Sequence, residues 1–267
     1  DDLLVAGGLG AQAFARAGGE LQHGLEDTLQ EAQGTTSNET SNHFSSQYLR
    51  DGEGSVLDGG AGNDTLLGSF GHDTMIGGDG DDTFITHLGE GNDVINGESG
   101  NDVLNGNSGA DTINGGTDSD QLIWKLADGD DLFLSDGGGA TVSVKGTNGA
   151  DSIMVDISGT GSGVAIVANG SRAQIDGNVA GIFINGANGN DTVMFNGLST
   201  AGGQLITVDG NTGNDTINAG SVRSSGARLD LRGGAGQDSI IGGDNSDTLS
   251  GDAGNDTING GKGDDTL

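Results

Sequence analysis

The stretch Gly77-Gly78-Asp79-Gly80-Asp81-Asp82-Thr83-Phe84-Ile85 sets the pattern for most of this chain. Read as nine positions, it has glycine at positions 1, 2 and 4, aspartate at position 6 and an apolar residue at position 8. Between Leu57 and Leu122 the position-6 aspartates follow one another at steps of 9, 9, 11, 9, 9 and 9 residues: Asp64, Asp73, Asp82, Asp93, Asp102, Asp111 and Asp120. The same step returns at Asp238, Asp247, Asp256 and Asp265. A short fixed period predicts a repeat architecture.

Each nonapeptide is predicted to form a tight loop followed by a short strand. Glycine permits the positive φ angles of a loop whose backbone carbonyls point inward. Positions 7 to 9, such as Thr83-Phe84-Ile85, then form a strand whose middle side chain also points inward. Two nonapeptides make one turn of a solenoid. Loops eighteen residues apart stack along one edge, which brings together Asp64 and Asp82, Asp102 and Asp120, Asp238 and Asp256, and Asp247 and Asp265.

The stacked carboxylates predict a bound metal. One carboxylate per loop supplies a hard oxygen ligand, and calcium takes about six to eight oxygens in flexible geometry. Without a cation, two carboxylates about 4 Å apart repel by roughly 4 kcal/mol at an effective dielectric constant near 20. One apolar side chain per strand offsets little of the backbone entropy of about 1–2 kcal/mol per residue. We therefore expect folding to be coupled to the binding of several Ca2+ ions.

The composition excludes several classes of partner. The 267 residues include 56 glycines, no proline and no cysteine, and the net charge is -31. A chain this acidic offers no surface for nucleic acid, and an anionic membrane is a poor partner. No apolar run approaches the roughly 18 residues that span a bilayer, so we expect no membrane insertion. Low hydrophobicity with high charge is typical of disorder unless a counter-ion neutralises the charge.

The period divides the chain into five segments. They are the tail of an upstream repeat (1–12), a helical insert (13–50), a first calcium β-roll (51–125), a wide β-helix (126–232) and a second calcium β-roll (233–267). Apolar residues between Ala11 and Gln33 recur every three or four positions, as in an amphipathic helix. We expect this insert to pack its leucines on the roll and cover one end. A docking or lid element is the alternative, and residues 43–50 fit a short helix or a strand.

Two irregularities interrupt the first roll. The segment Thr86-His87-Leu88-Gly89-Glu90 adds two residues between Asp82 and Asp93. We expect this bulged turn to replace one calcium site with a looser one. Asp118 stands at position 4, where glycine is expected, which predicts the last tight turn before the geometry changes.

Between Lys125 and Leu231 the repeat broadens. Four segments keep a Gly-x-Asp-Ser/Thr-apolar core, and their aspartates are 40, 24 and 23 residues apart: Asp151, Asp191, Asp215 and Asp238. Alternating strands are predicted between them, at 141–144, 164–167, 181–184 and 205–208. We expect a wider parallel β-helix with a larger aliphatic core and less dependence on calcium. Because Asp151, Asp191 and Asp215 have no partner eighteen residues away, they fit turn residues and metal ligands about equally well.

The sequence contains no evident catalytic constellation. The four histidines are scattered, and neither an H-E-x-x-H zinc motif nor a G-x-S-x-G nucleophile motif occurs. Carboxylate pairs are numerous, but none is singled out as the acid and base of a glycosidase would be. Trp124 and Tyr48 stand alone, which gives little support to a sugar-stacking platform. We therefore expect that the chain is not an enzyme. At position 5, four polar residues are predicted to point outward into solvent: Asn63, Asp81, Asn92 and Asn101.

Gly59-Gly60-Ala61-Gly62-Asn63-Asp64-Thr65-Leu66 and its copies resemble the repeat of the RTX (repeat-in-toxin) family of secreted bacterial proteins. The resemblance is close over 57–122 and 233–267, loose between them and absent from 13–50. It implies an all-β fold, a parallel β-roll/β-helix solenoid with two tight rolls flanking a wider β-helix and a small N-terminal helical insert. The implied calcium ligands are the eleven position-6 carboxylates and loop carbonyls that include those of Gly59, Gly60, Gly62, Gly77, Gly78 and Gly80.

The resemblance also implies export by a type I system, with folding outside the cell in calcium, and hence an extracellular or cell-surface location. We expect a non-catalytic calcium-binding structural segment of a surface-layer protein or an adhesin. Its expected partners are further copies of itself or a cell-surface polysaccharide. The alternative is an accessory calcium-binding module of a secreted RTX enzyme or toxin whose catalytic domain lies outside this chain.

Overall fold

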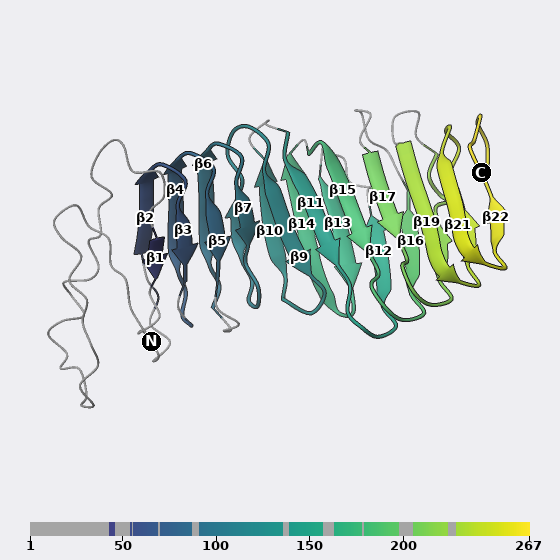
Figure 1. The fold of residues 1–267 in the computed structure, drawn as a ribbon, viewed down its shortest axis with the longest axis horizontal. Coiled ribbons are helices and arrows are strands. Elements are labelled where there is room, and N and C mark those ends of the chain that lie inside the picture. Colours follow the sequence, from purple (N-terminus) through teal and green to yellow (C-terminus); the bar gives the residue numbers. More distant parts are fainter. Residues whose placement is uncertain are drawn as a thin grey trace, which may run out of the picture.

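The computed structural model describes residues 43–45, 54, 56–68, 70–86, 91–135, 139–156, 163–177, 179–197, 205–223 and 228–267. Over these ranges the chain is all β and winds into an elongated solenoid with two sheets as its walls (Figure 1). The helix predicted between Ala11 and Gln33 lies outside the described residues, and of the segment 43–50 the structure describes one short strand, His43–Ser45. No helical segment in these ranges has the length and apolar character needed to cross a bilayer.

The two sheets differ in their number of strands. The ten-stranded sheet has the spatial order β1 (His43–Ser45), β3 (Thr65–Leu67), β5 (Thr83–Ile85), β7 (Val103–Asn105), β9 (Gln121–Lys125), β11 (Thr141–Lys145), β15 (Gly181–Asn185), β17 (Leu205–Asp209), β19 (Arg228–Gly236) and β21 (Thr248–Gly254). The twelve-stranded sheet has the order β2 (Val56–Ala61), β4 (Thr74–Asp79), β6 (Val94–Ser99), β8 (Thr112–Asn114), β10 (Asp131–Ser135), β14 (Ser171–Gly177), β13 (Val164–Ala168), β12 (Ser152–Asp156), β16 (Thr192–Asn196), β18 (Thr216–Asn218), β20 (Ser239–Ile241) and β22 (Thr257–Asn259).

Neighbouring strands within a sheet come from successive turns of the chain. Thr65 of β3 pairs in parallel with Thr83 of β5, eighteen residues on. In the middle of the chain, Leu205 of β17 pairs in parallel with Arg228 of β19, 23 residues on. The predicted solenoid, with narrow turns at both ends and wider turns between them, is therefore confirmed.

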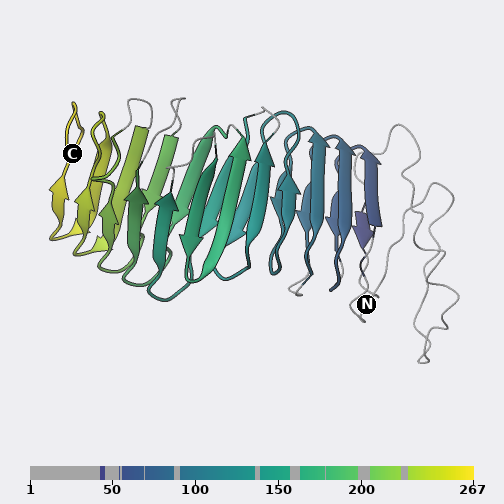
Figure 2. The ribbon, with the colours of Figure 1, turned by 180° about the vertical axis from the view of Figure 1, so that it is seen from behind.

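One strand departs from the predicted parallel arrangement. β12, β13 and β14 form a meander in which β13 runs antiparallel to both neighbours, with Val167 opposite Met154 and Arg172. The strand predicted at 164–167 therefore exists, but it is the reversed middle strand of this insertion. The meander accounts for most of the long step between Asp151 and Asp191, because one sheet gains three strands while the other advances only from β11 to β15 (Figures 1 and 2).

The core is one side chain wide in the narrow turns and two side chains wide in the middle. Three-residue strands such as β3 bury only their middle residue, Leu66. Five-residue strands such as β11 bury two alternate residues, Val142 and Val144. Because stabilisation follows the apolar area removed from water, at about 25 cal/mol per Å², the wide turns gain more from their core than the narrow turns do.

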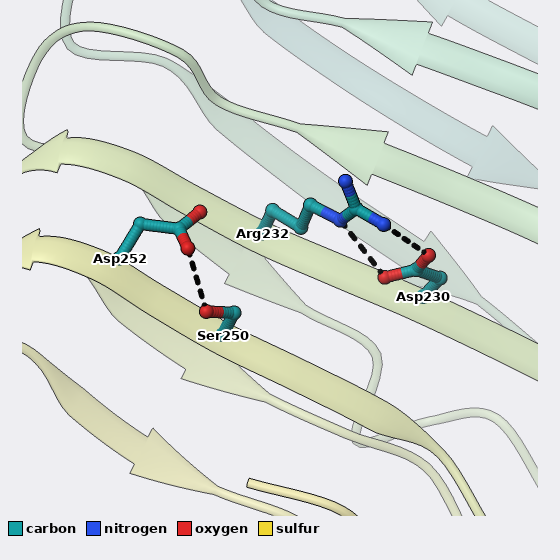
Figure 3. A network of polar contacts seen from close by, with 4 residues as sticks. All are labelled: Asp230, Arg232, Ser250 and Asp252. Carbon is teal, nitrogen blue, oxygen red and sulfur yellow. Dashed lines mark hydrogen bonds and ion pairs between the residues drawn. The ribbon is translucent and has the colours of Figure 1, made fainter.

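The outer faces of the last turns carry local polar pairs. Along β19 the Arg232 guanidinium donates to Asp230 from Nε (3.2 Å) and Nη2 (2.8 Å), and along β21 the Ser250 hydroxyl donates to Asp252 (2.8 Å) (Figure 3). Residues two apart on a strand share a face, so each of these pairs lies within a single strand. Exposed pairs of this kind add little stability, and these two do not tie one turn to the next.

Candidate metal centre

Each position-6 aspartate lies at the start of a strand, as Asp82 illustrates. Asp82 directly precedes β5 and is only 1% exposed. Its backbone N–H donates to Oδ1 of Asp102 in the next turn (2.7 Å), and its own Oδ1 accepts the N–H of Asp64 in the preceding turn (2.7 Å). The aspartates thus form a ladder in which each carboxylate binds the backbone of the turn before it.

These ladders run along two edges of the solenoid. We call edge 1 the loops that lead into the ten-stranded sheet, at the top of Figure 1, and edge 2 the loops that lead into the twelve-stranded sheet. On edge 1, N–H to Oδ1 bonds of 2.7–3.1 Å link Asp64, Asp82, Asp102 and Asp120, and also Asp247 and Asp265. On edge 2, bonds of 2.7–3.0 Å link Asp73, Asp93, Asp111 and Asp131, and separately Asp151, Asp191, Asp215, Asp238 and Asp256. Every aspartate predicted from the nonapeptide period lies in one of these ladders.

Edge 2 also contains aspartates that the period does not identify. Asp151, Asp191 and Asp215, which fit two roles equally well from sequence, bond to one another in the same way as the tight-turn aspartates. Asp131 is absent from the prediction altogether. Its signal is Gly129-Asp130-Asp131-Leu132-Phe133, which keeps the Gly-x-Asp-x-apolar core 20 residues after Asp111. The step between ladder positions is therefore set by strand pairing rather than by a constant number of residues.

The second carboxylate oxygen, Oδ2, points away from the ladder. In the described part of the chain, this atom is buried and has no hydrogen-bond partner in Asp82, Asp102, Asp111, Asp120, Asp191, Asp215 and Asp238. An unpaired ionised oxygen is costly to bury unless a cation or a donor compensates for the lost water. The recurrence of this atom from turn to turn indicates a site that a cation completes.

Glycine at position 1 leaves space beside this oxygen. A Cβ atom placed on Gly59 would lie 2.7 Å from Oδ2 of Asp64 and 2.7 Å from the carbonyl oxygen of Gly77 in the next turn. We call this arrangement a cradle: the Oδ2 of one loop and the position-1 carbonyl of the next loop face the same point. The same pair of oxygens flanks Gly77, Gly97, Gly186, Gly210 and Gly242. A side chain at position 1 would fill the cradle.

Glycines at positions 2 and 4 allow successive loops to stack. Gly78 (φ 113°) and Gly80 (φ 132°) are in the left-handed region, and a Cβ on either would strike the carbonyl of Gly60 or Gly62 one turn earlier. Asp118 at position 4 adopts the same conformation (φ 75°) without being glycine.

The six predicted carbonyl ligands therefore occupy different surroundings. The carbonyl of Gly77 reaches a cradle, whereas those of Gly60, Gly62 and Gly80 lie against the next loop's glycine. The carbonyl of Gly78 lies 3.3 Å from the Ser99 hydroxyl, which donates to it. The loop that Gly59 would face in the preceding turn falls outside the described residues.

Burial raises the pKa of several of these aspartates. Burial raises the pKa of Asp82 from 3.8 to about 7; the Asp64 N–H opposes the shift, and the charges of Asp102 and Asp64 add to it. Burial likewise raises the pKa of Asp102 to about 6 and that of Asp191 to about 6. A cation beside Oδ2 would favour the ionised form and so reverse these shifts.

The donor atoms fit calcium. Each cradle offers a carboxylate oxygen and a backbone carbonyl oxygen, the hard ligands that calcium prefers. Among the described residues, no three His, Cys, Asp or Glu side chains come close enough to hold a metal by themselves. These sites therefore do not suit a metal that needs a compact cluster of side-chain ligands, whereas calcium accepts many carbonyl ligands in flexible geometry.

Position-5 side chains form a second ladder on the rim. Asn63, Asp81, Asn92 and Asn101 are exposed, as predicted, and each accepts a backbone N–H from the next turn, for example from Asn101 to Asp81 (2.8 Å). His72 has the same role, since its Nδ1 accepts the N–H of Asn92 (2.7 Å). These side chains therefore help to stack the loops.

Trp124 belongs to the core. Its side chain is fully buried, and its Nε1 donates to the carbonyl of Gly129 (3.3 Å). It therefore offers no face on which a sugar could stack.

Comparison with protein families agrees with this geometry. The model of the RTX calcium-binding nonapeptide repeat matches residues 52–86, 87–122, 207–221 and 231–267. Together with the β-solenoid, these matches fit an RTX calcium-binding β-roll protein. Its RTX repeats are calcium-binding motifs and occur in several copies, so the protein binds multiple Ca2+ ions. The matches cover both narrow rolls and include Asp215, but they do not reach Asp131, Asp151 or Asp191. The search of curated proteins returned no match.

Proposed function

We propose that this chain is a non-catalytic, calcium-dependent structural segment of a secreted surface-layer protein or adhesin. The observation that carries the proposal is the repeated cradle, in which a carboxylate oxygen and the carbonyl of the next turn face one point at successive turns. An ion in each cradle would link one turn to the next, so that calcium supplies the cohesion that the narrow core lacks. Such a solenoid is stable where calcium is abundant, as outside the cell.

The proposed calcium ligands are the oxygen atoms that line the cradles. On edge 1 they are Oδ2 of Asp64, Asp82 and Asp102 with the carbonyls of Gly77, Gly97 and Gly115. In the wide turns they are Asp191 and Asp215 with the carbonyls of Gly210 and Gly233, and further on Asp247 with that of Gly260. Six ladder members are proposed as additional ligands: Asp73, Asp111, Asp120, Asp238, Asp256 and Asp265. The loop of Asp93 is built differently, because Thr86 stands where its cradle glycine would be.

A structural role is proposed because the buried acids are equivalent. An acid-base pair needs two carboxylates in unlike environments. Asp82, Asp102 and Asp191 share the same position, the same ladder bond and the same direction of pKa shift. Equivalent acids at every turn suit a scaffold better than a single reaction centre.

The proposed partners and location follow from charge and calcium. With a net charge of -31, copies of the chain repel one another unless cations bridge them. We propose that exposed acids share calcium between neighbouring molecules, or between the protein and an acidic cell-surface polysaccharide. Export through a type I system as an unfolded chain, with folding outside, completes the proposal.

Titration of the whole chain with calcium tests it. In excess chelator the circular dichroism of β-structure should be strongly reduced, and millimolar calcium should restore it. Magnesium at the same concentration serves as the control, since it demands a smaller octahedral site and dehydrates reluctantly. Electron microscopy of the calcium-loaded protein should show sheets or filaments. Monodisperse monomers would favour the accessory module of a secreted enzyme or toxin, and full order in chelator with no bound calcium would overturn the calcium role.

A further inference from the structure

Edge 2 of the first roll does not have glycine at position 1 of every loop. On edge 1 the four successive loops have glycine there: Gly59, Gly77, Gly97 and Gly115. On edge 2 the corresponding residues alternate between glycine and larger residues: Gly68, Thr86, Gly106 and Trp124. Both larger residues are buried, with Thr86 2% exposed and Trp124 fully enclosed. At these two positions a side chain therefore stands where the edge 1 loops have only the hydrogen of a glycine.

Thr86 donates a hydrogen bond to the oxygen that a cation would use. Its hydroxyl donates to the carbonyl of Gly106 in the next turn. That carbonyl is the counterpart of Gly97 O, which faces the open cradle of Gly77 on edge 1. Between the loops of Asp93 and Asp111, a hydroxyl donor thus replaces the cation as the partner of the carbonyl.

Asn107 makes the return connection between the same two loops. It is 5% exposed and takes position 2 in the left-handed region, with φ 53°. Its Nδ2 donates to the Thr86 carbonyl (2.6 Å) and lies 3.0 Å from the Thr86 hydroxyl. The two loops therefore bind each other through donors in both directions.

Lys125 extends the connection to a third loop and supplies a positive charge. Its Nζ donates to Oδ1 of Asn107, eighteen residues earlier, at 2.6 Å, and the side chain is partly buried. Arg232 and Lys262, by contrast, pair with Asp230 and Asp244 on the exposed surface. Lys125 is thus a cation built into the stack of loops.

We infer that Thr86, Asn107 and Lys125 form a staple that closes edge 2 of the first roll between the loops of Asp93 and Asp111 without calcium. The staple uses a hydroxyl, an amide and an ammonium group as donors at the place where other loops present oxygens to a metal. It follows that these two loops bind no calcium between them and stay stacked in its absence. This inference rests on the proposed calcium sites of edge 1.

Two matched variants of the 267-residue chain test how many calcium ions each edge binds. Asp82→Asn and Asp93→Asn each remove one charge at position 6 and keep an oxygen that accepts the ladder N–H. Native mass spectrometry should show that Asp82→Asn loses at least one calcium ion and that Asp93→Asn loses none. An equal loss in both variants would overturn the staple. A wild-type chain that binds no calcium would instead overturn the proposed function.

Hydrogen exchange in excess chelator tests the staple directly. The amide of Asp93 bonds to Asp111 on edge 2, and that of Asp82 makes the same bond to Asp102 on edge 1. Without calcium, we expect the Asp93 amide to exchange about tenfold more slowly than the Asp82 amide. A hydrogen bond from a charged group such as the Lys125 ammonium contributes enough stability for a difference of about this size. Lys125→Met and Thr86→Val should abolish this difference, whereas Lys262→Met, which removes an exposed lysine, should not. Equal exchange of the two amides in the wild type, or no effect of Lys125→Met, would overturn the inference.

Discussion

The backbone N–H of Asp151 donates to Oδ1 of Asp191 at 2.8 Å, although 40 residues separate them. Between the two, the chain completes the meander of β12 to β14 and crosses the other sheet in β15. The ladder closes nevertheless because β12 pairs directly with β16, with Ser152 opposite Thr192. The solenoid therefore tolerates an insertion when strand pairing still brings the N–H of one aspartate to the Oδ1 of the next aspartate in the ladder.

Replacement of Asp82 by alanine should weaken calcium-induced folding of the first roll and leave the second roll largely intact. The change removes a proposed ligand and also leaves the buried N–H of Asp64 without its acceptor, at a cost of about 1–3 kcal/mol. Hydrogen exchange of the two rolls at increasing calcium would measure it. Asp81→Asn is the control, because it removes a neighbouring charge that is exposed and keeps an acceptor. Equal loss of protection in both rolls would contradict the modular picture.

The metal-free protein should be more ordered in mild acid than in mild base. Burial raises the pKa of Asp82 to about 7 and that of Asp111 to about 8, against 3.8 for the free group. Between the free pKa of 3.8 and the raised pKa of about 8, the folded state holds more protons than the unfolded state. The free energy of unfolding therefore falls as pH rises. This stabilisation is complete below about pH 4 and is lost by about pH 8. Circular dichroism in chelator across this range would show it.

Calcium should reverse this dependence. Protons and calcium compete for the same carboxylates, so the affinity for calcium should increase as pH rises towards 8. Isothermal titration at several pH values, with the protons released on binding measured from buffers of different ionisation enthalpy, would test this. Binding that is independent of pH, with no proton release, would show that the buried aspartates are not the ligands.

Substitution of Gly77 by alanine should impair calcium binding more than its small size suggests. A Cβ at this position would lie 2.8 Å from the carbonyl of Gly97 and closer still to Oδ2 of Asp82, so it would fill the cradle. Gly149→Ala is the matched control, since a Cβ there meets only the Thr147 hydroxyl, at 3.8 Å. Calcium titration followed by circular dichroism should separate the two variants. If both bind calcium as the wild type does, the cradle is not the metal site.

In excess chelator the wide turns should retain more protection from hydrogen exchange than the narrow ones. Strands such as β17 bury two residues, Ile206 and Val208, whereas β7 buries only Leu104. The wide turns therefore depend more on hydrophobic burial and less on charge neutralisation. Mass spectrometry of peptides from 139–223 and 91–122 would compare the two regions. Simultaneous and complete loss in both would indicate that the whole solenoid folds as one unit.

Much of the metal centre was predictable because it is local. The glycines, the position-6 aspartate and the apolar residue of one nonapeptide lie within nine residues, and eighteen residues bring the next copy to the same edge. The pairing of Asp64 with Asp82 and of Asp247 with Asp265 follows from that count alone, and the structure shows both bonds. Whether each of these aspartates holds an ion remains a prediction.

Around the meander, residue spacing does not predict which aspartates bond to one another. Asp131 and Asp151 each lie in a ladder, but meander strands separate the two runs, and no fixed period reveals which aspartate meets which. The reversal of β13 has the same origin, because an alternating strand pattern carries no information about direction. Likewise, Lys125 and Asn107 look like simple departures from glycine until their contact places an ammonium between loops.

The amino-acid sequence by itself determined the turn of eighteen residues, the thin core and the need for a counter-ion, because glycine, aspartate and one apolar residue per repeat act over a few bonds. Only the tertiary structure decided which carboxylates of the wide turns share an edge, where the meander interrupts the ladders and which loops close with the protein's own donors. Those outcomes depend on hydrogen bonds between residues that are distant in the chain, and strand register rather than residue spacing sets them.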